Sequence, residues 1–116
     1  MNNRKRLKQI ENENIIWTIY LFIIFFSFYA NQLEKDYFIN NNTNSKNKYR
    51  TINAIIFITL IIIYSYFEKD AIETYNSNDY LSKLSLLATT LVLISGLLFL
   101  YIIIEDTNIE EEIAFN

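Results

Sequence analysis

The chain has 116 residues, of which 52% are hydrophobic, and a formal net charge of −3 at pH 7. It contains no cysteine and no histidine, which excludes disulfides, thiolate metal sites and histidine-based acid–base chemistry. No stretch carries a catalytic motif, a metal-ligand set or a nucleotide-binding loop, so we expect neither an enzyme nor a bound cofactor.

The N-terminal segment, residues 1–14, is basic. It has two arginines and two lysines between positions 4 and 8, immediately before the first apolar stretch. A cleaved signal peptide would need small residues near the end of that stretch, where the chain instead has bulky Phe28 before Ala30. We therefore expect this segment to be retained and to lie in the cytoplasm.

Three stretches without Asp, Glu, Lys or Arg follow, at residues 15–33, 51–67 and 84–104. Parts of them, such as 21–26 and 60–63, are apolar on every helical face, whereas helices of a soluble bundle keep a polar stripe. Three helices in a soluble bundle are the alternative, but they cannot bury surfaces that are apolar all round. The stretches are therefore predicted to be transmembrane helices, each near the roughly 20 residues that a bilayer requires.

Polar connectors at residues 34–50 and 68–83 separate these stretches, and we expect both to be loops. Each is short enough to join antiparallel neighbours. The predicted fold class is therefore all-α, an integral membrane protein with three transmembrane helices in an up-down-up bundle. Within the first connector, residues 41–43 fit the glycosylation pattern, a match that an Asn-rich segment produces by accident.

Lysine and arginine counts predict the orientation of the bundle. Segments 1–14 and 68–83 together carry six such residues, while segment 34–50 carries four. Because basic residues favour the cytoplasmic side, we expect the N-terminus inside and the C-terminus outside. The opposite orientation stays open, because three of the four lie just before the second span.

Small and hydrogen-bonding residues within the spans are the candidates for helix packing, because lipid competes for purely apolar contacts. One face of the third span follows helical spacing and includes the only glycine. Asn31 and Asn53 are expected at similar depth, either bonded across the first hairpin, with Glu34 or Asp36 near Arg50, or solvated at the interface. The predicted packing residues are Ser85, Thr89, Val92, Gly96, Ser27, Asn31 and Asn53.

Aromatic residues with a polar tip lie near the ends of the spans, where such rings sit among lipid headgroups. We interpret them as interface anchors in preference to a cage around a ligand. The predicted anchors are Trp17, Tyr64, Tyr66, Tyr80 and Tyr101.

The C-terminal tail, residues 105–116, contains five acidic residues and no basic one. Such a run is typical of a solvated end that stands off anionic lipid. A more specific hypothesis is that the tail is a docking strip for a basic partner. Its residues would be Ile109, Glu110, Glu111, Glu112 and Ile113.

Together these patterns predict a small non-enzymatic multi-pass protein of the cell membrane that acts through helix–helix contacts. Its partners would be the bilayer and either itself or a larger membrane protein, with no nucleic acid, in the role of accessory subunit or immunity-type protector. The alternatives are a holin-like oligomeric pore and, least favoured, an interfacial enzyme using Glu34, Asp36 and Arg50. The abundance of Ile, Asn, Tyr and Lys, with scarce Gly, Pro and Ala, indicates AT-biased coding, which we expect of a bacterial or mobile-element gene.

Overall fold

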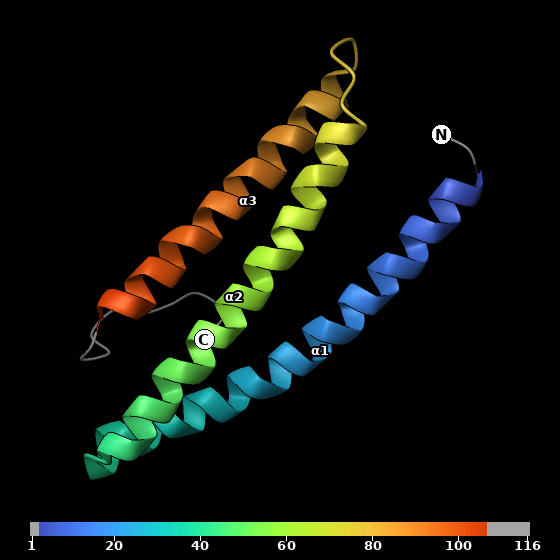
Figure 1. Ribbon diagram of the computed structural model, residues 1–116. Helices are drawn as coiled ribbons and strands as arrows, with labels where there is room; N and C mark the ends of the chain where they lie inside the picture. The colour runs from blue at the N-terminus through green and yellow to red at the C-terminus, as the bar shows by residue number, and fades with distance from the viewer. Residues whose placement is uncertain (1–2, 107–116) are drawn as a thin grey trace.

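Three helices account for all the regular structure of residues 3–106, the part of the chain that the computed structural model describes (Figure 1). They are α1 (Asn3–Asn40), α2 (Thr43–Glu73) and α3 (Tyr80–Glu105). All three are long and apolar enough to cross a membrane. The all-helical fold class is thus confirmed, and each predicted span falls within a helix long and apolar enough to cross a membrane.

The helices extend well beyond the predicted spans. With 38, 31 and 26 residues, they reach about 57, 46 and 39 Å at the usual rise per residue, against a hydrocarbon thickness of about 30 Å. The connectors shrink accordingly to residues 41–42 and 74–79. We predicted loops because these segments are polar. They lack proline and glycine, however, and their Glu, Lys and Arg residues are good helix formers.

Helix α2 lies in the middle of the structure, and each of its neighbours runs back along it (Figure 1). Gln9 near the start of α1 bonds to Asp70 near the end of α2, and Thr89 early in α3 bonds to Glu68. No Cα atom of α1 comes within 8 Å of one in α3. The helices therefore form an open arrangement in which α1 and α3 contact α2 but stay apart from each other.

The core is built on one part of α2, where Ile56, Phe57 and Leu60 are buried and pack with Ile103 of α3. A second small cluster joins α1 to the start of α2. There Ala30, fully buried, faces Tyr49, and the small side chain lets the two helices approach closely.

Most large apolar side chains outside these clusters remain exposed. Trp17, Phe25 and Ile62 keep 67%, 63% and 66% of their surface. Apolar surface on this scale is rare on soluble monomers and typical of helices that face lipid.

The turn between α1 and α2 is organised by one carboxylate. Asp36 accepts hydrogen bonds from Asn40, Asn42 and Ser45 at 2.7, 2.8 and 2.6 Å, and these bonds hold the pKa of Asp36 below its usual range, led by the one from Ser45. Asn41 adopts a left-handed φ of 54°, which asparagine tolerates better than most residues. The cluster of turn formers seen in the sequence thus closes a connection of only residues 41–42.

Candidate helix-binding site

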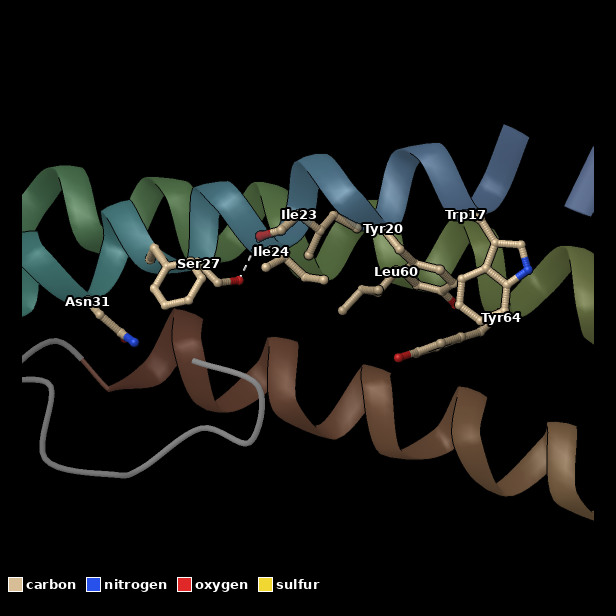
Figure 2. A pocket seen from close by; sticks show the side chains of 9 residues that line it. Trp17, Tyr20, Ile23, Ile24, Ser27, Asn31, Leu60 and Tyr64 are labelled. Carbon is tan, nitrogen blue, oxygen red and sulfur yellow. Dashed lines mark hydrogen bonds between the residues drawn. The ribbon is translucent and has the colours of Figure 1, made fainter. Parts of the chain in front are cut away.

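A groove of about 650 Å³ opens along α1 and α2 on the side toward α3 (Figure 2). Figure 2 shows the Asn31 and Tyr64 side chains extending into the space between α1 and α3. The groove exists because α1 and α3 do not meet over this part of α2. Its lining residues are Trp17, Tyr20, Ile23, Ile24, Ser27, Phe28, Asn31, Leu60 and Tyr64.

The chemistry of the groove is apolar with a few hydrogen-bonding groups. None of the described residues that line it is charged. The Ser27 hydroxyl bonds within its own helix, where it donates to the Ile23 carbonyl at 2.8 Å. The remaining polar side-chain groups of the lining are the hydroxyls of Tyr20 and Tyr64, the amide of Asn31 and the indole N–H of Trp17. Such a surface suits an uncharged apolar segment that carries one or two hydrogen-bonding side chains.

The Tyr64 ring packs against α3 where the chain has its only glycine. A Cβ atom on buried Gly96 would lie 3.1 Å from two carbons of the Tyr64 ring and 3.4 Å from Ile61. The ring therefore occupies space that any other residue at position 96 would need. Tyr64, predicted as an interface anchor, lies half-buried against α3 and lines the groove with its other side.

The predicted packing face of α3 is only partly turned toward α2. Gly96 is buried and Thr89 is half-buried, while Ser85 is exposed and Val92 keeps 45% of its surface. The close approach of α3 to α2 therefore lies at Gly96 and, nearer the start of α3, at Thr89.

Glu68 forms two hydrogen bonds between α2 and α3. Its two carboxylate oxygens accept hydrogen bonds from Thr89 and Thr90, each at 2.7 Å. Both threonine hydroxyls also lie near the Leu86 carbonyl, at 3.1 and 2.8 Å. Along α3, Thr89 lies about 8 Å from Leu84, where the third predicted span begins.

Sequence reasoning missed this contact. Among the ionisable groups at the ends of the spans it considered only Glu34, Asp36 and Arg50, and Glu68 is the first residue after the second span. The signal available was the adjacent Thr89 and Thr90 inside an otherwise apolar stretch. What the sequence did not provide was the register of α3 against α2.

Asn31 and Asn53 are not joined by a hydrogen bond in the described structure. Asn31 is exposed in the groove, whereas Asn53 keeps only 1% of its surface and its buried Oδ1 has no hydrogen-bond partner. Asn53 lies beside Tyr49, whose pKa is raised by its burial and next by the Glu34 carboxylate. The Tyr49 phenol therefore stays protonated and hydrogen-bonds to the Glu34 carboxylate.

Arg50 bonds to the C-terminal end of α3 and, among the described residues, forms no ion pair with Glu34 or Asp36. Its Nη2 donates to the Ile104 carbonyl at 3.0 Å, while its buried Nε has no partner. A cation at a helix C-terminus satisfies carbonyls that lack an intrahelical donor and complements the helix dipole. Asp36 is instead committed to the α1–α2 turn.

The other predicted anchors differ in exposure. Trp17, Tyr80 and Tyr101 keep 67%, 70% and 64% of their surface, and Tyr66 is half-buried. Their role at a headgroup layer stays a prediction. The proposed docking strip, Ile109 to Ile113, lies outside the described residues.

No protein-family model matches the chain, and no significant similarity to a curated protein or to a solved structure is found.

Proposed function

We propose that the three helices cross the cell membrane in up-down-up order, with the N-terminus in the cytoplasm and the C-terminus outside. The length and apolar character of the helices support this arrangement, as does the exposure of their large side chains. The distribution of lysine and arginine supports the direction.

We further propose that the protein acts by holding a transmembrane helix of a larger membrane protein in the groove along α1 and α2, on the side toward α3. The observation that carries this proposal is the open groove itself, which α1 and α2 line and which stays open because α1 and α3 do not meet. A protein that binds its target in this way serves as an accessory subunit or as a protector against a membrane-active toxin, and needs no catalytic group.

The lining of the groove favours a protein helix over lipid tails. In hydrocarbon, helices associate through close packing and through hydrogen bonds between polar side chains, each contributing about 1 kcal/mol. Tyr20, Asn31 and Tyr64 offer such bonds. An acyl chain cannot accept them, whereas a serine, threonine or asparagine on a partner helix can.

The experiment is site-specific photocrosslinking in native membranes. A photoreactive phenylalanine replaces Ile24, which lines the groove, or its neighbour Phe25, which does not; they keep 52% and 63% of their surface. We expect the probe at Ile24 to attach to an apolar transmembrane segment of one membrane protein, identified by mass spectrometry, and the probe at Phe25 to label lipid.

Three results would count against this function. Equal labelling from both positions removes the groove as the binding surface. Attachment at Ile24 to a second copy of this chain replaces the partner by self-association. Leakage of the membrane on expression indicates the pore-forming alternative.

A further inference from the structure

A second cavity, about 200 Å³ in volume, lies where the start of α1 meets the end of α2. It sits at the edge of the predicted spans, at the level expected for lipid headgroups, and on the predicted cytoplasmic side. Its lining is polar and charged, unlike that of the groove. The lining residues are Lys5, Lys8, Gln9, Asn12, Tyr66, Lys69, Asp70 and Glu73.

The cavity is held in shape by a bond between its two walls. Gln9, with only 9% of its surface exposed, donates from Nε2 to Asp70 Oδ1 at 2.8 Å. This bond fixes the first turns of α1 against the last turns of α2, and so brings lysines from both helices to one place.

The charge of the cavity suits a single phosphate group. Three ammonium groups line it, from Lys5, Lys8 and Lys69, against the two carboxylates of Asp70 and Glu73. Asp70 is engaged by Gln9, and Glu73 lies 4.0 Å from Lys69 along α2. The surplus of positive charge, with Asn12 and Tyr66 as further donors, matches a headgroup that carries one negative charge.

We infer that this cavity binds the phosphate of an anionic phospholipid from the cytoplasmic leaflet, with phosphatidylglycerol as the ligand to test. The inference rests on the proposed insertion in the membrane but not on the helix-binding groove. A lipid bound here connects α1 to α2 at the end opposite the turn of residues 41–42.

The test uses the full chain purified in detergent, with lipid retention measured by native mass spectrometry and thermal stability measured during lipid titration. We expect one phosphatidylglycerol to be retained in preference to phosphatidylcholine. The variant Lys8→Gln with Lys69→Gln is expected to lose about tenfold in apparent affinity, because each removes a cation from the headgroup site.

Two matched variants make the result specific to the cavity. Lys48→Gln with Lys83→Gln removes the same charge from exposed positions elsewhere and is expected to leave the affinity unchanged. Lys8→Arg with Lys69→Arg keeps both cations and is expected to bind as the wild type does. The arginine pair also shows that the two positions tolerate replacement.

The inference is overturned by equal loss in both glutamine pairs, which would mean diffuse surface attraction, or by equal retention of the two lipids. It is also overturned as a lipid site if inorganic phosphate at equal concentration displaces the lipid. Crosslinking at Ile24 tests the helix-binding groove and does not depend on lipid binding at this cavity. The failure of the groove proposal is therefore distinguishable from the failure of the lipid site.

Discussion

Replacing Gly96 with leucine is expected to lower the stability of the bundle by about 3 kcal/mol, the upper end of the usual cost of overpacking. The added Cβ alone would lie 3.1 Å from the Tyr64 ring. Since membrane helices depend on close approach, α3 must move away from α2 or the ring must leave its place. Thermal unfolding in detergent is expected to shift down by about 10 °C.

The matched control is Leu97→Ile, one position round the helix at an exposed site. It conserves volume and is expected to be nearly silent. Insertion itself is expected to survive Gly96→Leu, because leucine is favourable in hydrocarbon. Because Tyr64 forms part of the groove, Gly96→Leu is also expected to reduce crosslinking from Ile24. Wild-type stability and crosslinking in this variant would mean that the Gly96 face does not hold α3 on α2.

Removing both threonine hydroxyls beside Glu68 is expected to cost about 2 kcal/mol. Hydrogen bonds to charged groups contribute roughly 1.5–3 kcal/mol each, but pairs within membranes usually contribute less. In Thr89→Val with Thr90→Val, the shape is retained while the Glu68 carboxylate loses both donors at 2.7 Å. A half-buried charge without partners then opposes the packing of α3 on α2.

A double-mutant cycle isolates this contact. In a Glu68→Leu background the same valine pair is expected to cost little, because no carboxylate is left unpaired and the threonines of that background still have the Leu86 carbonyl as acceptor. Chemical unfolding of all four proteins in the same detergent provides the comparison. Equal cost of the valine pair in both backgrounds would contradict a role for Glu68 in holding the two helices.

Composition was sufficient to predict the helical spans. A run such as Leu21 to Phe26 has no polar face at any helical angle, so a helix that contains it must be buried or face lipid, and the length of the whole apolar stretch favours a helix over a strand. Gly96 was likewise predictable as a close contact, because it is the only residue of the chain without a side chain.

Contacts between helices depend on register, which composition does not encode. Gln9 and Asp70 are 61 positions apart, and nothing local in either segment marks them as partners. Glu68 with Thr89, and Arg50 with the Ile104 carbonyl, likewise require the relative shift of α2 and α3. The groove follows from an absent contact between α1 and α3, and no pattern in a single helix predicts it.

The most direct test of the central claim, that the chain crosses a membrane three times, uses the absence of cysteine. Single replacements Asn44→Cys near the first turn and Ser77→Cys in the second connector, both at exposed positions, are labelled with a membrane-impermeant maleimide in intact cells. We expect Asn44→Cys to react at once and Ser77→Cys to react only after permeabilisation. The reverse pattern would invert the orientation but keep the crossing of α2. Equal labelling of both positions in intact cells would place the two connectors on one side and contradict the three-span account.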